Sequence, residues 1–287
     1  MRRRHAVPAL LCLFAVASAT SLDWPATAPV SIEFGGPNAG APIEGLFLSG
    51  SGIDIRSAEA GEVTFERNAR DGRTRLPSTL GATLVLEGEK GFASVYGYLP
   101  AVADPGARSY VAGALIGKSG QAGLLDGPGF LFAMFDRKSD RWVNPRVFLP
   151  RLDDAKAPVI RKVSLESKGQ EWVLGEQKGI PQGSYSIIVE AAEQEKGISG
   201  LVGGPPWYVR VLANGEKVAE LKTEIASVKE GRLSFYPDTQ DGASLVDANG
   251  SIRLPPRAFA RGKMYLEVLV RDFAGNERSA GWTLLVE

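Results

Sequence analysis

The side chains best suited to catalysis near neutral pH are almost missing from this 287-residue chain. Histidine and cysteine occur once each, as His5 and Cys12. Hydrolytic zinc sites need neutral imidazoles or thiolates as ligands and a general base that activates the bound water. Ser/His/Asp and Cys/His arrangements need the same side chains, and no Ser-x-x-Lys spacing offers a lysine-assisted serine. The composition therefore excludes these chemistries in their usual form.

Carboxylates are abundant but follow no catalytic pattern. The chain has 33 acidic and 33 basic residues and a formal net charge of zero. Paired carboxylates for glycoside hydrolysis stay open as an alternative, although no pair is singled out. The run 136–141 is typical of a solvated hairpin tip. Nucleic acid is excluded as a partner because phosphate binding needs a clustered positive field.

The first 19 residues predict a secretory signal. Residues 1–5 are cationic, residues 6–17 are nearly all apolar, and Ala17-Ser18-Ala19 has the small-x-small pattern that precedes cleavage. The apolar run is shorter than the roughly 18 to 20 residues that span a bilayer, and no later segment resembles a membrane helix. We therefore expect an exported protein of the periplasm or cell envelope. Its mature chain would lack cysteine, so packing alone would stabilise it.

The rest of the sequence predicts an all-β protein. Short alternating or continuous apolar runs are separated by glycine, with little 3.6-residue periodicity. The clearest strand-like runs are 83–87, 93–96, 130–135 and 264–270. In the last run, Met264, Leu266, Val268 and Val270 share one face, and the polar residues Tyr265, Glu267 and Arg271 point the other way.

Turn signals and a polar stretch divide the chain. Asn214-Gly215 suits a type I′ hairpin turn, and Asp272 with Asn276 is interpreted as a tight turn whose side chains satisfy backbone amides rather than calcium. The stretch 149–158 is polar and bounded by proline. We expect an N-terminal antiparallel sheet domain at 23–152 and a two-sheet sandwich at 158–287.

Five motifs follow one another in residues 33–150. They are Gly50-Ser-Gly-Ile-Asp54 with Gly61-Glu-Val63, then Tyr96-Gly-Tyr-Leu99, Val111 to Gly120, Gly127-Pro-Gly-Phe-Leu-Phe132, and Val143-Asn-Pro145. In this order they resemble the lysostaphin-type, or LytM-type, zinc endopeptidases of peptidoglycan. That family has His-x-Gly-Ile/Val-Asp, Gly-x-Val, Tyr-x-His-Leu, Val-x-x-Gly-x-x-Ile-Gly and Gly-Pro-His-Leu-His before Asn-Pro. The resemblance covers somewhat under half of the chain.

The resemblance implies a scaffold that has lost its zinc site. It places the family's zinc ligands at Gly50, Asp54 and Phe132, and its catalytic histidines at Tyr98 and Phe130. Four of these five side chains neither bind zinc as histidine does nor exchange protons near neutral pH. We therefore expect no cofactor and no peptidase activity.

Two interpretations of the remaining residues stay open. Asp54 with Glu59 or Glu62 suits calcium or magnesium, whereas Asp54 alone would accept backbone hydrogen bonds in its loop. Phe130 and Phe132 share one strand face, and with Asp54, Tyr96 and Tyr98 they form either an aromatic groove for a sugar or peptide or a floor filled with core side chains.

The second half has a weaker resemblance, to immunoglobulin-like domains. It rests on residues 183–191, 206–211 and 270–276. Together these patterns predict a non-catalytic envelope protein that binds peptidoglycan or a partner such as a wall hydrolase. The alternatives are a residual hydrolase with an unrecognised site and a purely structural envelope protein.

Overall fold

The computed structural model describes residues 22–38, 41–68, 78–88, 90–124, 127–194, 204–229, 232–239, 242–246 and 250–287. The predicted signal at 1–19 lies outside them. In these ranges the regular structure consists of strands and one short 3₁₀-helix, which confirms the all-β prediction. Within the same ranges, no helix is long and apolar enough to cross a membrane.

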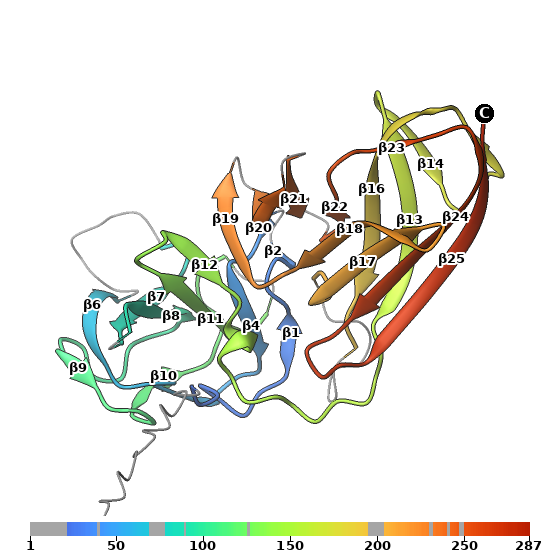
Figure 1. Cartoon of the computed structure of the whole chain (residues 1–287). Coiled ribbons are helices and arrows are strands. Elements are labelled where there is room, and N and C mark those ends of the chain that lie inside the picture. The colour runs from blue at the N-terminus through green and yellow to red at the C-terminus, as the bar shows by residue number, and fades with distance from the viewer. Residues whose placement is uncertain are drawn as a thin grey trace, which may run out of the picture.

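The first half is an antiparallel sheet with a small second layer, at the left of Figure 1. The sheet runs in the order β12-β11-β8-β7-β6-β9, and β4 pairs with β11 while β1 pairs with β4. The strands β5 and β10 form the second layer. The elements are β1 Val30–Ile32, β2 Pro37–Asn38, β3 Ala41–Pro42, β4 Gly45–Ser49, β5 Asp54–Arg56, β6 Gly61–Arg67, β7 Ala82–Glu87, β8 Phe92–Leu99, β9 Ser109–Tyr110, β10 Leu115–Lys118, β11 Gly129–Asp136, β12 Arg141–Val143 and the 3₁₀-helix Pro145–Val147.

The second half has two sheets that enclose one core. One sheet runs β15-β25-β24-β17-β18, and the other side consists of β14-β13-β16-β22-β21-β20-β19. The strands are β13 Val159–Ser167, β14 Gln170–Val173, β15 Gly179–Ile180, β16 Gly183–Ala192, β17 Tyr208–Ala213, β18 Glu216–Lys222, β19 Ile225–Lys229, β20 Arg232–Thr239, β21 Gly242–Val246, β22 Ile252–Arg253, β23 Arg257–Phe259, β24 Gly262–Arg271 and β25 Glu277–Val286.

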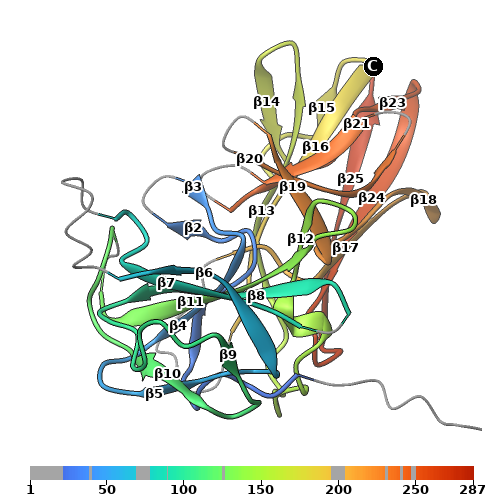
Figure 2. The same cartoon turned by 90° about the vertical axis from the view of Figure 1, so that its left-hand side faces the viewer.

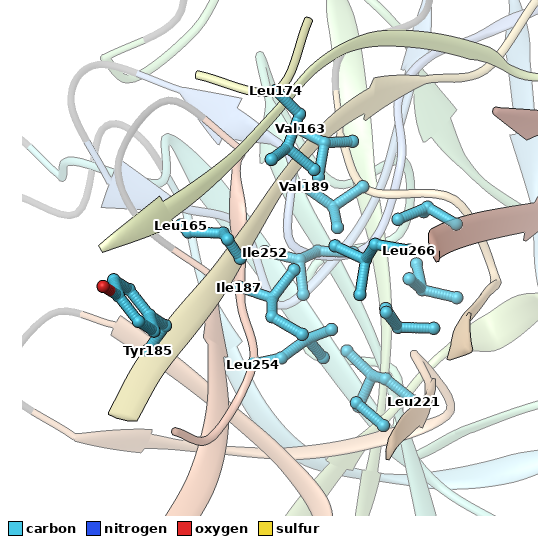
Figure 3. Close-up of a cluster of buried hydrophobic side chains, with 14 of the residues drawn as sticks. Val163, Leu165, Leu174, Tyr185, Ile187, Val189, Leu221, Ile252, Leu254 and Leu266 are labelled. Carbon is cyan, nitrogen blue, oxygen red and sulfur yellow. The ribbon is translucent and has the colours of Figure 1, made fainter. Parts of the chain in front are cut away.

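Period-2 patterns in the sequence explain this core. Met264, Leu266, Val268 and Val270 of β24 are buried, while Tyr265 between them is 48% exposed. Figure 3 shows Leu266 facing side chains of the opposite sheet, among them Val163, Leu165, Ile187 and Val189. The strand face predicted for residues 264–270 is therefore confirmed.

The predicted turns are also present. Asn214 and Gly215 have φ angles of 52° and 86° between β17 and β18, as a type I′ turn requires. Asp272 Oδ1 accepts hydrogen bonds from the backbone N–H groups of Gly275 at 2.6 Å and Asn276 at 2.8 Å. The interpretation of Asp272 as a turn residue is confirmed.

The two halves share one hydrogen-bonded sheet. Strand β12 pairs with β19, with Trp142 opposite Ala226 and Val143 opposite Ile225. Asn144 continues the contact, because its backbone N–H and its side-chain Nδ2 donate to the carbonyls of Glu224 and Thr223 at 2.7 and 2.9 Å. Figures 1 and 2 both show β19 beside β12 at the junction of the halves.

Candidate functional site

The two faces of β11 carry different residues of the last family motif. Phe130 and Phe132 are fully buried and belong to the main core of the first half, where the ring of Phe132 lies 5.3 Å from that of Tyr96. Tyr96 is tied to this side because its hydroxyl accepts a hydrogen bond from the N–H of Ala58 at 2.8 Å. Leu131 points to the opposite face, as alternation along a strand requires.

A β-bulge moves Tyr98 to the Leu131 face. Leu84 of β7 pairs with Tyr96, and Ala82 pairs with Leu99, so two residues of β8 lie opposite one residue of β7. Tyr98 has a φ angle of 60° at this irregularity. An extra residue reverses the in-and-out alternation of the strand. Tyr96 and Tyr98 therefore lie on different faces although they are two positions apart.

The expected groove of Asp54, Tyr96, Tyr98, Phe130 and Phe132 is consequently wrong, because Tyr98 lies on the other face of the sheet and Asp54 lies at the surface. The two phenylalanines and Tyr96 are core side chains without exposed surface. Of the two accounts left open by the sequence, the filled core describes Phe130 and Phe132.

The structure also corrects the alignment of the motif Gly-Pro-His-Leu-His by one residue. With Gly127-Pro128 matched directly, the two histidine positions fall on Gly129 and Leu131. These positions share the strand face toward which Tyr98 turns, as a common site requires. Gly50 lies close by, because its N–H donates to the carbonyl of Pro128 at 3.0 Å. In this alignment the resemblance places the family's imidazoles at Gly50, Tyr98, Gly129 and Leu131.

An apolar cluster fills this face, and we call it the filled floor. It consists of Ile43, Phe47, Tyr98, Leu131 and Ala133, all of them buried. The rings of Phe47 and Tyr98 meet edge to face with centroids 6.5 Å apart. The filled floor presents no imidazole, thiolate or carboxylate of its own.

The glycines at the histidine positions have no room for a larger side chain. A Cβ at Gly129 would lie against the ring of Phe47 and only 2.5 Å from the carbonyl oxygen of Leu48. Gly50 has a φ angle of 140°, and a Cβ there would collide with the side chain of Ile53. Phe47 and Ile53 thus occupy the space into which ligands would project.

Two ionisable groups border the filled floor. Burial raises the pKa of Tyr98, the charge of Glu44 raises it further, and Asn38 Nδ2 donates to the Tyr98 hydroxyl at 3.4 Å. Burial also raises the pKa of Glu44. Tyr98 is therefore a protonated phenol near neutral pH, and Glu44 is the nearby carboxyl group that the sequence did not single out.

Asp54 lies outside the filled floor and forms ion pairs with two basic side chains. Its Oδ1 lies 2.6 Å from Lys118 Nζ and its Oδ2 lies 3.4 Å from Arg56 Nη2. The hydrogen bond and charge of Lys118, together with the charge of Arg56, lower the pKa of this 42% exposed carboxylate. Asp54 thus forms surface ion pairs instead of the expected backbone hydrogen bonds.

The carboxylates considered as further metal ligands lie elsewhere. Glu59 lies beside Ser94 and Lys90, and burial raises its pKa. Glu62 points outward from β6. Among the residues that the structure describes, no three His, Cys, Asp or Glu side chains are grouped so that they could hold a metal ion. The side chains at the family positions do not fit zinc.

A cavity at the junction of the halves was not predicted. Its volume is about 600 Å³, and its lining includes Trp24, Arg146, Glu193, Trp207 and Phe273. These residues come from both halves of the chain, up to 249 positions apart in sequence (273 − 24). No local pattern links them, so only the folded structure reveals the site.

Comparisons with known proteins give partial matches. A protein-family model matches residues 157–287, and no curated protein matches the chain. The chain is similar to a structure described as a peptidase M23 from Pseudomonas aeruginosa, with 25% identity and a TM-score of 0.38 over 46% of this chain and 51% of that one. The aligned region thus spans about half the length of that protein.

Two other structures are similar at lower identity. The SpoIIQ–SpoIIIAH pore-forming complex aligns at 18% identity and a TM-score of 0.40, over 46% of this chain and 92% of that chain. Lysostaphin from Staphylococcus simulans aligns at 12% identity and a TM-score of 0.38, over 84% of this chain and 93% of its own. All three scores lie below 0.5.

Proposed function

We propose that this chain is an exported, non-catalytic protein of the cell envelope that retains the scaffold of a lysostaphin-type endopeptidase. In this proposal residues 23–152 form the peptidase-like domain and residues 158–287 form an immunoglobulin-like sandwich. The protein binds peptidoglycan, or a partner such as a wall hydrolase, and thereby regulates or supports wall remodelling.

One observation carries this proposal. Buried apolar side chains, chiefly Phe47 and Leu131, take up the space where the family motifs call for imidazoles. A zinc-bound hydroxide needs nitrogen, sulfur or oxygen ligands and an open coordination position. Leu131 offers no donor atom, and Asp54 is already paired with Lys118. The scaffold motifs are kept while the chemistry is lost, which favours a role in binding.

The test combines a binding assay with an activity assay on the purified chain. We expect saturable co-sedimentation with purified peptidoglycan sacculi, or crosslinking to a wall hydrolase in envelope fractions. We also expect no release of soluble muropeptides, with or without added Zn²⁺. An active lysostaphin-type enzyme serves as positive control. Release that a chelator abolishes would contradict the proposal, and the absence of any specific ligand would favour the purely structural alternative.

The residual-hydrolase alternative has its own test at Glu44. The charge of Glu44 acts on Tyr98, and both groups have raised pKa values. If muropeptides are released, Glu44→Gln should abolish the release while Glu62→Gln, at an outward-pointing position of β6, should not. Release that survives Glu44→Gln would place the activity elsewhere.

A further inference from the structure

The cavity between the halves contains an unusual set of buried charges. Glu33, Glu193 and Asp272 are only 6%, 8% and 5% exposed, and all three line the cavity. Arg146, whose side chain is 10% exposed, is the buried cation of the lining. Burial of unequal numbers of opposite charges is unfavourable unless further partners compensate them.

The hydrogen bonds of these groups show which carboxylate needs a partner. Glu33 forms an ion pair with Arg146. Asp272 accepts from two backbone amides of its turn and from Asn276 Nδ2 at 2.8 Å. Glu193 accepts a hydrogen bond from the backbone N–H of Trp207, and Arg146 is the cation whose charge acts on it. Among the residues that the structure describes, no ion pair is formed by Glu193 itself. Burial, reinforced by the charges of Glu33 and Asp272, raises its pKa well above the usual range.

The walls of the cavity suit an organic cation. Trp207 packs against Phe273 with ring centroids 5.1 Å apart, and Trp24 lies on the first-half side. Both indoles already attract protein cations, since the guanidinium of Arg146 lies 5.1 Å from the ring of Trp24 and Lys222 Nζ lies 5.6 Å from that of Trp207. Aromatic faces beside a buried carboxylate are the usual means of binding alkylammonium groups. The volume of about 600 Å³ also falls within the range of small-ligand sites.

We propose that this cavity binds a small organic molecule or peptide side chain that carries a primary ammonium group on an alkyl chain. The ammonium group lies at Glu193, where it adds positive charge to a lining with three buried acidic residues and one buried arginine, and the alkyl chain lies against Trp24, Trp207 and Phe273. Arg151, Asp153 and Asp154 of the connecting stretch also line the cavity, and together they add one net negative charge. The binding site is separate from the filled floor and does not depend on the function proposed above.

The direct test is calorimetric titration of the purified chain with Nα-acetyl-lysine amide. The neutral control ligand is Nα,Nε-diacetyl-lysine amide, which keeps the alkyl chain and loses the charge. We expect the chain to bind the lysine derivative and to bind the diacetylated control at least tenfold more weakly. Equal binding of both ligands, or binding of neither, would overturn the proposal.

Matched variants then locate the binding site. Glu193→Gln keeps the shape of the side chain and should weaken binding at least tenfold, whereas Glu216→Gln, at an exposed position of β18, should leave it unchanged. Thermal melting verifies that each variant is folded. Ala274→Trp provides a second route, because Ala274 lines the cavity but none of the turn hydrogen bonds described above involves it, so the larger side chain should block entry. Undiminished binding in both folded variants would exclude this cavity.

Discussion

The ion pair between Glu33 and Arg146 offers the strongest test of the energetics at the junction. Both side chains are nearly buried, at 7% and 10% exposure, and the guanidinium also packs on Trp24. Arg146→Met would keep an unbranched chain of similar length but leave Glu33 charged and unpaired. Removing one partner of a buried pair costs about 3–5 kcal/mol, mainly because the remaining charge has lost its compensation.

Stacking on Trp24 adds to this loss. A desolvated cation–π contact contributes about 2 kcal/mol or more, and methionine recovers part of it through its contact with the ring. We therefore expect Arg146→Met to lower the free energy of unfolding by at least about 3–5 kcal/mol, a large part of the 5–15 kcal/mol typical of folded proteins.

The assay is guanidinium chloride unfolding followed by tryptophan fluorescence and far-UV circular dichroism, with agreement of the two probes as the check on two-state behaviour. Adding Glu33→Gln to Arg146→Met should restore part of the lost stability, because no unpaired charge remains. Arg137→Met is the control, because the ion pair between Arg137 and Glu87 is partly exposed. Exposed ion pairs contribute about 0–1 kcal/mol to the free energy of unfolding. A loss below about 1 kcal/mol for Arg146→Met would refute the reasoning, because it would equal that of an exposed pair.

Four further predictions concern the other sites. Phe132→Ala should lower the free energy of unfolding by about 3–5 kcal/mol because the ring is fully buried, and a near-neutral effect in denaturant would contradict its place in the core. Gly129→Ala should lower the melting temperature, since the backbone oxygen of Leu48 cannot move away from the new Cβ; an unchanged melting temperature would argue against this close approach. The folded-state pKa of Glu193 lies above 4.5, so the free energy of unfolding of the wild type should fall relative to that of Glu193→Gln as pH rises from 4.5 through that pKa. If the two proteins lose stability in parallel with pH, Glu193 is not desolvated. Asp54→Asn should leave the thermal midpoint nearly unchanged because its ion pairs are exposed, and a large fall would reveal a structural role.

Much of the fold could be predicted from the sequence because period-2 burial and turn chemistry are local signals. The alternation in β24 and the Asn214-Gly215 turn both depend on neighbouring residues alone. The sheet face on which Tyr98 lies does not depend on neighbouring residues alone, because the bulge depends on how β8 pairs with β7. Counting by two from Tyr96 therefore gives the wrong face for Tyr98.

The candidate site was harder to predict for related reasons. A shift of one residue along β11 exchanges its two faces, so matching Phe130 and Phe132 to the histidines placed core rings in the site instead of Gly129 and Leu131. The junction cavity combines Trp24 with residues of the second half, and no spacing in the chain encodes that contact. Glu193 carries no motif and gains its significance only from burial.

The continuous pairing of β12 with β19 has a mechanical consequence. Linked domains usually rock about their linker, but here the pairing of Trp142 and Val143 with β19 and the main-chain hydrogen bond of Asn144 resist such rotation. The connecting stretch 151–157 is largely exposed and carries little of that restraint. Proteolytic cleavage within it should therefore leave two fragments that elute together in size-exclusion chromatography. A pulling force applied to one half would reach the other half through the hydrogen bonds between β12 and β19 rather than through the connecting peptide.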